Sequence, residues 1–212
     1  MLTYTKDKNN EDILLDSNNQ QVMMEWEKPY MEACIDFLQP KGNVLEVGFG
    51  MGYSATQIQK YKPKSYTIIE CNSEVIKKCK KWAKSYNNVT IIEAKWQEVI
   101  CTDRLGIYDE VFFDDFPNNL KNISELQLFQ INNRIHLFIE FLKQYHLKSN
   151  SKISAYLCKG KSMYSDPVWK SKYIDNINWK YDEKIMNINV SNIQKYHLST
   201  KKAIIPLLTL NY

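Results

Sequence analysis

Arginine is almost absent from this chain of 212 residues, although lysine is abundant. Arg104 and Arg134 are its two arginines, and lysine carries nearly all of the positive charge. Proteins that read nucleic acids depend on the planar arginine fork to bind bases and phosphates. The lysines at 77–84 surround apolar residues at helical spacing, which is more typical of a solvated helix face than of a nucleic-acid patch. The net charge of +4 therefore does not predict a nucleic-acid partner.

Long apolar runs and paired cysteines are also missing. The sequence has no apolar run of about 18 residues, and no apolar signal region follows the N-terminus, so we expect neither a membrane span nor export. The five cysteines are odd in number and none forms a Cys-x-x-Cys pair, which argues against a disulfide framework and a zinc site. We expect a cytoplasmic protein without a bound metal, either a monomer or a homodimer.

Short β-branched runs alternate with helical stretches along most of the chain. This order is typical of an α/β fold with a mostly parallel, doubly wound sheet, and the length suits one domain. The predicted strands cover residues 43–47, 66–69, 89–92, 110–113, 153–158, 184–190 and 203–210. The predicted helices cover residues 28–38, 54–60, 74–86 and 124–146. Residues 1–22 are polar and read as an irregular extension or a flap over the site, and residues 23–212 as a single domain.

Glycines at 48, 50 and 52 form a turn between the first predicted strand and the next helix. Such a turn lets a nucleotide approach the main chain at the carboxyl ends of the strands. Tyr53 breaks the dinucleotide fingerprint, and no phosphate-binding lysine follows. The pattern fits S-adenosylmethionine, which has no phosphates, and Glu70 at the end of the second strand is suited to bind its ribose. Trp96 either flanks the adenine ring or packs in the core.

Two groups of carboxylates are candidates for the chemistry. Asp114 and Asp115 end the fourth predicted strand, where they suit a solvated acidic loop, a magnesium pair for O-methylation, or a site for a cationic substrate. Glu27 lies beside Trp26 at the start of a predicted helix, where a negative charge is also favoured by the helix dipole. The residue types alone leave these alternatives open.

Seven blocks of sequence together resemble guanidinoacetate N-methyltransferase and the related fungal-type arginine δ-N-methyltransferases. The most specific are Val-Met-Met-x-Trp-Glu-x-Pro-Tyr-Met at 22–31 and Leu-Glu-Val-Gly-Phe-Gly-Met at 45–51. The others lie at 68–72, 96–99, 108–109, 114–117 and 205–207. The resemblance extends over about residues 20–210. It implies a Rossmann-like class I methyltransferase dependent on S-adenosyl-L-methionine (AdoMet), with a small guanidino compound as substrate.

The resemblance also implies roles for individual residues. Cofactor contacts are implied for Met23, Met31, Glu46, Gly48, Phe49, Gly50, Met51, Glu70, Cys71, Asn72, Lys95 and Trp96. Glu27 and Asp114 match the two carboxylates that hold the guanidinium, and Trp26 and Asp115 beside them are further substrate-binding candidates. Two carboxylates bind a planar guanidinium through charge-assisted, bidentate hydrogen bonds and fix one nitrogen in line with the methyl group. Asp114 is the better candidate for the base, and Glu27 for the clamp.

Several departures bear on the substrate. Asp115 stands where creatine-forming members carry Thr, and Phe116 replaces their Tyr. Gly52 and residues 56–59 resemble the arginine-modifying branch more closely. That branch usually carries an extra N-terminal repeat domain, which we do not expect here. We expect methylation of guanidinoacetate to creatine, with methylation of free or protein arginine, or of another small guanidino compound, as the alternative.

Further readings of the sequence stay open beside this one. Lys159, Lys161 and Ser162 are either a surface loop or a binding site for a substrate carboxylate. A metal-dependent O-methyltransferase and a non-catalytic AdoMet-binding protein are also open alternatives. An adenine-N6 nucleic-acid methyltransferase is disfavoured, because the turn at 114–117 lacks adjacent prolines.

Overall fold

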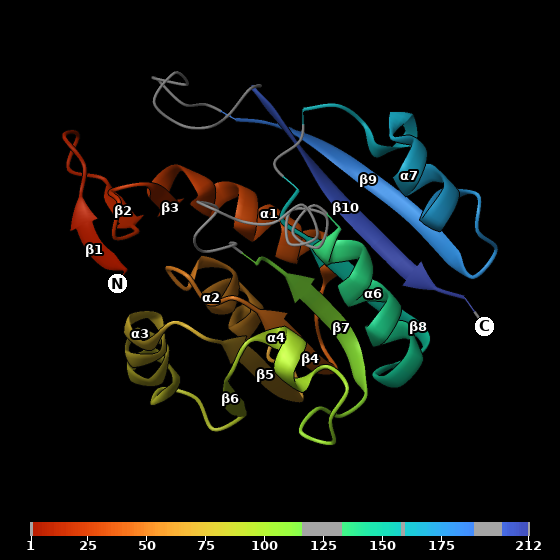
Figure 1. Cartoon of the computed structure of the whole chain (residues 1–212), viewed down its shortest axis with the longest axis horizontal. Helices are drawn as coiled ribbons and strands as arrows, with labels where there is room; N and C mark the ends of the chain where they lie inside the picture. The colour runs from red at the N-terminus through yellow and green to blue at the C-terminus, as the bar shows by residue number, and fades with distance from the viewer. Residues whose placement is uncertain (1, 116–132, 158–159, 189–200, 212) are drawn as a thin grey trace.

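A seven-stranded sheet forms the centre of the computed structural model, which describes residues 2–115, 133–157, 160–188 and 201–211 (Figure 1). Its strand order is β6-β5-β4-β7-β8-β10-β9. The strands are β4 (Asn43–Val47), β5 (Ser65–Glu70), β6 (Val89–Glu93), β7 (Tyr108–Phe113), β8 (Leu147–Ala155), β9 (Trp179–Asn187) and β10 (Lys202–Leu210). The first five of these are parallel, and β10 runs antiparallel to both β8 and β9. The predicted seven-stranded, mostly parallel sheet is confirmed.

Successive residues of the central strands enter two different cores. Val44 and Phe112 pack in one core, whereas their neighbours Leu45 and Phe113 pack in the other. Side chains alternate between the faces of a strand, and both faces of a sheet with crossover helices are covered. This is why these strands read as continuous apolar runs rather than as alternating ones.

Helices cover both faces. Residues of α1 (Lys28–Leu38), α2 (Tyr53–Lys60) and α3 (Ser73–Ala83) belong to the first core, and those of α4 (Trp96–Val99), α6 (Arg134–Tyr145) and α7 (Pro167–Trp169) to the second. The prediction for α1 is confirmed, and α3 ends three residues earlier than predicted. The predicted helix 124–146 is present as α6, while its part before residue 133 lies outside the described residues. None of the described helices is long and apolar enough to cross a membrane.

The prediction that residues 1–22 are irregular is wrong. Strands β1 (Thr3–Lys6), β2 (Asp12–Leu15) and β3 (Gln21–Met24) form a separate antiparallel sheet that lies at the start of α1 (Figure 1). Asp7 and Asp16 each accept two backbone N–H groups of the turn that follows. Asn10 and Asn19 adopt the left-handed conformation. Asp and Asn favour such turns, so a repeated Asp-x-Asn-Asn signal was present in the sequence but not recognised.

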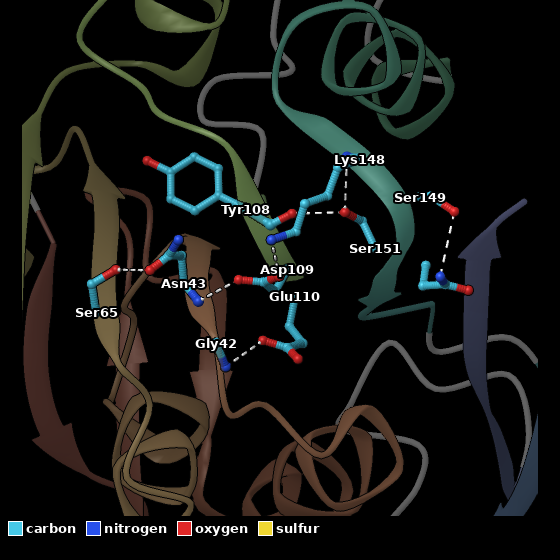
Figure 2. Close-up of polar contacts among 10 residues, drawn as sticks. Gly42, Asn43, Ser65, Tyr108, Asp109, Glu110, Lys148, Ser149 and Ser151 are labelled. Atoms are coloured by element: carbon cyan, nitrogen blue, oxygen red, sulfur yellow. Dashed lines mark hydrogen bonds and ion pairs between the residues drawn. The ribbon is translucent and has the colours of Figure 1, made fainter. Parts of the chain in front are cut away.

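The amino ends of the strands are held by a polar network (Figure 2). Asp109 accepts a hydrogen bond from the Asn43 N–H group at 2.8 Å and pairs with the Lys148 ammonium at 2.5 Å. Glu110 accepts from the Gly42 N–H group at 3.0 Å. These contacts fix the relative register of β4, β7 and β8 at one edge of the sheet. The glycine turn and the acidic residues lie at the opposite end of the strands, where the carboxyl ends are.

Candidate functional site

The glycine turn joins β4 to α2 and touches the end of β7. Gly48 has a φ of +84°, and a Cβ added there would lie 2.0 Å from the backbone oxygen of Asp114. The parallel ladder continues past the strand ends, because the Asp114 N–H group donates to the Val47 carbonyl at 3.0 Å. A residue with a side chain at 48 would therefore push apart the two strand ends that form the site.

The N-terminal sheet lies against this turn. The sulfur of Met23 accepts a hydrogen bond from the Met51 N–H group at 3.2 Å, and a Cβ at Gly50 would meet that sulfur at 2.6 Å. The Tyr4 hydroxyl donates to the Gly50 carbonyl at 2.7 Å. The Lys78 ammonium lies 4.0 Å from the centre of the Tyr4 ring. Met23 was predicted to lie at the site, whereas Tyr4 was not, because nothing in its local sequence indicates that β1 reaches the turn.

Glu70, at the carboxyl end of β5, is buried beside the turn. One carboxylate oxygen accepts from the Phe49 N–H group at 3.0 Å, and the other accepts from Cys71 and Asn72, each at 2.8 Å. The Asn72 side chain then caps α3. The structure thus brings together the predicted cofactor residues of the first and second strand ends. A carboxylate offers about four acceptor positions, so Glu70 retains capacity for a ligand hydroxyl.

Glu46 is fully buried, between β5 and α2. It accepts hydrogen bonds from the hydroxyl groups of Ser54 and Tyr66. Burial raises the pKa of Glu46 to about 8. These two hydrogen bonds connect the first turn of α2 to the sheet. The Glu46 side chain therefore stabilises the position of the glycine turn, which immediately precedes α2.

Asp115 points toward Trp96. The Trp96 Nε1–H group donates to the Asp115 carboxylate at 2.8 Å. Nε of Arg134, on α6, donates to the Asp115 backbone oxygen at 3.2 Å and lies 3.8 Å from its carboxylate. The Trp96 ring is buried and packs edge-on against Phe138, with centroids 5.2 Å apart. Asp115 therefore connects a predicted cofactor residue to a cation that sequence analysis did not assign to the site.

The two acids predicted to hold the substrate lie close enough for the charge of Asp114 to act on Glu27. Glu27, at the end of the 3₁₀ turn η1 (Glu25–Glu27), is 7% exposed and accepts from the Met24 N–H group at 3.0 Å. Burial, with repulsion from the nearby Asp114 carboxylate as the next cause, raises the pKa of Glu27 to about 8. Asp114 directly follows β7, and it shares the sheet face of Phe112 because strand residues alternate.

The electrostatic surroundings of Asp114 are mostly negative. Burial and, after it, repulsion from Asp115 raise the pKa of Asp114, Arg134 opposes them, and the resulting pKa is about 7. The charge of Asp114 is in turn felt at Glu46 and at the buried thiol of Cys34 on α1. Glu27 and Asp114, two carboxyl groups with raised pKa values near the glycine turn, are suited to bind a cation or to accept a proton near neutral pH.

The other predicted site residues lie around this centre. Met31 is fully buried in α1, and Trp26 is partly buried against the first core. Lys95 and Cys71 are exposed, and the Lys95 charge acts on the Cys71 thiol. Ser162 caps η2 (Met163–Ser165), next to an exposed Lys161. Phe116, Pro117 and Lys159 lie outside the residues that the structure describes. Among the described residues, no group of three or more His, Cys, Asp or Glu side chains could hold a metal ion.

Comparison with known proteins assigns the chain to a family. The family model for guanidinoacetate N-methyltransferase matches residues 3–205. The chain belongs to this family. The recognition made from its sequence blocks is confirmed, and with it AdoMet as the cofactor of the family.

Curated relatives match part of the chain. Protein arginine N-methyltransferase 2 of Candida glabrata is 37% identical over 133 residues, which cover 58% of this chain and 32% of that protein. The proteins of the same name from Yarrowia lipolytica and Saccharomyces cerevisiae are 32% and 31% identical, and the matches cover 27% and 30% of their lengths. The match thus spans about a third of these relatives.

Solved structures agree on the fold. N-methyltransferase NodS of Bradyrhizobium japonicum superposes with a TM-score of 0.60 at 8% identity, covering 88% of this chain and 97% of NodS. The TYW2 protein of M. jannaschii, solved with AdoMet, superposes with a TM-score of 0.54 at 18% identity, covering 98% and 84%. At such identities the likeness concerns the fold alone. The predicted class I methyltransferase fold is confirmed.

The residues present fit the family's cofactor. Glu70 is a buried acceptor at the strand edge where a ribose would lie, and the glycine turn leaves the main chain accessible beside it. The Trp96 ring is fixed by Asp115 and Phe138 near the third strand end. The acidic pair lies next to this surface, where it would face a cationic sulfonium.

Proposed function

We propose that this protein is an AdoMet-dependent methyltransferase that methylates a nitrogen of a guanidino group. The observation that carries the proposal is the meeting of Glu27 and Asp114, two buried acids from distant parts of the chain, beside the glycine turn. A buried pair of like charges is unfavourable unless a cation joins it. Membership of the guanidinoacetate N-methyltransferase family and the names of the curated relatives both support a guanidino cation.

Guanidinoacetate is the first substrate to test, with creatine as its product. Arginine, free or within a protein, is the second candidate, and the curated relatives named protein arginine N-methyltransferase 2 favour it. Both substrates present the same planar cation to the acid pair. They differ in the groups attached to it, so the acid pair alone does not discriminate between them.

The acid pair has two tasks in the proposed reaction. When bound, AdoMet supplies a methyl group on a cationic sulfur. Glu27 and Asp114 accept charge-assisted hydrogen bonds from the guanidinium, which offset the repulsion between the two cations and align the attacking nitrogen. A guanidinium is a poor nucleophile because its pKa lies above about 12. Asp114, whose pKa of about 7 lies near neutrality, accepts the proton that this nitrogen loses.

The N-terminal sheet serves as the cover of this site. Tyr4 and Met23 attach it to the glycine turn, and strand β3 crosses from the predicted extension into the predicted domain that begins at residue 23. A cover that excludes water strengthens the contacts between the acids and the substrate cation. We propose this role for residues 1–22 in place of an irregular flap.

A substrate screen tests the proposal. Methyl transfer from AdoMet would be measured with guanidinoacetate, arginine, agmatine and an arginine-rich peptide, in the presence and absence of a chelator. We expect turnover of at least one guanidino compound that is insensitive to the chelator. Transfer to a catechol that disappears with the chelator would instead establish the magnesium-dependent alternative for Asp114 and Asp115. AdoMet binding without transfer to any of these compounds would contradict the proposed reaction.

A further inference from the structure

Tyr156 lies directly behind the proposed substrate clamp. It follows β8, and its N–H group donates to the Phe113 carbonyl at 2.9 Å, so the ladder between β7 and β8 continues to this residue. Phe113 and Ala155 are partners in the parallel register. Asp114 and Tyr156 are thus the next residues of two adjacent strands, and strand alternation directs both toward the face where Glu27 lies.

The ring of Tyr156 is held by α1. It packs edge-on against Tyr30 with centroids 5.3 Å apart. The Tyr30 hydroxyl accepts from the Leu157 N–H group at 3.2 Å and donates to the Ile204 carbonyl at 2.5 Å. The residue before Leu157 therefore has a fixed backbone as well as a fixed ring. Such support from several elements is what holds a side chain in a productive geometry.

The hydroxyl of Tyr156 acts on the Glu27 carboxylate as a hydrogen-bond donor and lowers the pKa of Glu27. The Met24 N–H group donates to Oε1 of the same carboxylate. Glu27 thus has two hydrogen-bond donors from distant parts of the chain: Met24, just before its own turn, and Tyr156, just after β8. A carboxylate has about four acceptor positions, so two donors fix its plane and leave positions for a substrate.

We propose that Tyr156 is a positioning residue of the guanidino site, and that its hydroxyl sets the orientation in which Glu27 clamps the substrate cation. The inference rests on the proposed function, because it assigns to Glu27 a guanidinium to hold. A hydrogen bond to a charged acceptor is among the stronger ones in proteins. The same bond favours the ionised form of Glu27, and so opposes the effect of burial and of the neighbouring Asp114 on the pKa of Glu27.

Tyr156→Phe removes the hydroxyl and keeps the ring that packs on Tyr30. We expect the KM for the guanidino substrate to rise about ten-fold, the value for one lost hydrogen bond to a charged group. The dissociation constant for S-adenosylhomocysteine should stay within about two-fold of wild type, because the substitution keeps the ring that packs on Tyr30. Tyr164→Phe is the matched control, because Tyr164 is half-exposed and its hydroxyl donates, among the described residues, to the Tyr181 carbonyl at 3.3 Å.

A measurement independent of turnover follows the carboxyl group itself. Glu27 would be titrated by carboxyl ¹³C NMR in wild type and in Tyr156→Phe. The titratable groups around Glu27 include Asp114 after β7, Tyr53 on α2 and Tyr156 after β8. The apparent pKa of Glu27 should rise in Tyr156→Phe and stay unchanged in Tyr164→Phe. A merely structural role of the ring would move neither the titration nor the KM.

The outcomes separate the inference from the proposed function. If Glu27→Gln impairs substrate capture while Tyr156→Phe matches wild type in KM and in the Glu27 titration, the inference is wrong and the function stands. If Tyr156→Phe weakens cofactor binding as much as substrate binding, the positioning role is also wrong. If no guanidino compound reacts with the wild-type protein, the proposed function is wrong. The Tyr156–Glu27 contact is tested separately: a Glu27 titration in Tyr156→Phe that equals the wild-type titration would contradict it.

Discussion

The affinity for a guanidino cation should depend steeply on pH. Burial is the main cause that raises the pKa of Glu27 to about 8 and that of Asp114 to about 7 in the unliganded protein, with repulsion from Asp114 adding to the first shift and repulsion from Asp115 to the second. A bound cation favours the ionised forms and therefore lowers both pKa values. Binding is then weak at low pH, where the acids are protonated, strengthens as the pH rises through 7 and 8, and levels off above 9. The guanidinium stays protonated over this range, so the dependence belongs to the protein.

The magnitude follows from the same two pKa values. If the acids titrate independently, about 5% of the free protein has both ionised at pH 7 and about 90% at pH 9. Affinity should therefore rise about 20-fold between these two pH values, and binding at pH 7 should release about 1.4 protons. Coupling between the acids spreads the two steps without changing the direction of the effect.

Isothermal titration calorimetry measures both quantities. Guanidinoacetate would be titrated into protein saturated with S-adenosylhomocysteine, whose neutral thioether adds no charge, in buffers of different ionisation enthalpy. In Glu27→Gln only Asp114 remains to titrate, so a single step is expected. An affinity that is constant from pH 6 to pH 9, with no proton release, would refute the assignment of the acid pair as the cation site.

Three substitutions test other parts of the site. Asp114→Asn should lower turnover about a hundred-fold to ten-thousand-fold by removing the proton acceptor, with S-adenosylhomocysteine binding unchanged by calorimetry; near-normal rates would exclude the base role. Glu70→Ala should weaken the binding affinity for AdoMet about ten-fold to a hundred-fold, because ligand contacts are lost and three N–H groups lose their acceptor. Glu93→Ala, at an exposed position, is the control, and equal AdoMet affinities of the two variants would contradict the ribose role of Glu70. Gly48→Ala should destabilise the protein by roughly 3 kcal/mol or more through overpacking and backbone strain, and an unchanged urea midpoint would show that the strand ends can separate.

Local signals were sufficient for most of the fold. The continuous apolar strands are buried on both faces, and Pro29 marks the first turn of a helix whose bounds were predicted as observed. The N-terminal sheet was missed because its strands are only four residues long, and the Asp-Asn turns that join them were not read as turns. Four-residue strands carry little periodicity, so only their turn chemistry could have indicated them.

The site was predicted in part, through the residues that the family motifs contain. Tyr4, Arg134 and Tyr156 were missed, because each reaches the site from an element whose local sequence says nothing about its neighbour. Asp115 was predicted to bind a substrate, and its hydrogen bond from the Trp96 N–H group was not foreseen. Contacts of this kind depend on strand register and on how helices dock, which are long-range properties.

The sequence by itself determined the chemical groups at the strand ends: glycines at 48 and 50 and carboxylates at 70 and 114. Their positions along parallel strands were enough to place them at one edge, because such strands all end on the same side. Only the tertiary structure decided that Glu27, at the start of α1, meets Asp114 after β7 in a buried space, with Tyr156 behind it. That meeting arises from the packing of α1 on the sheet, and burial of both carboxylates together is what raises their pKa values and makes a cation their natural partner.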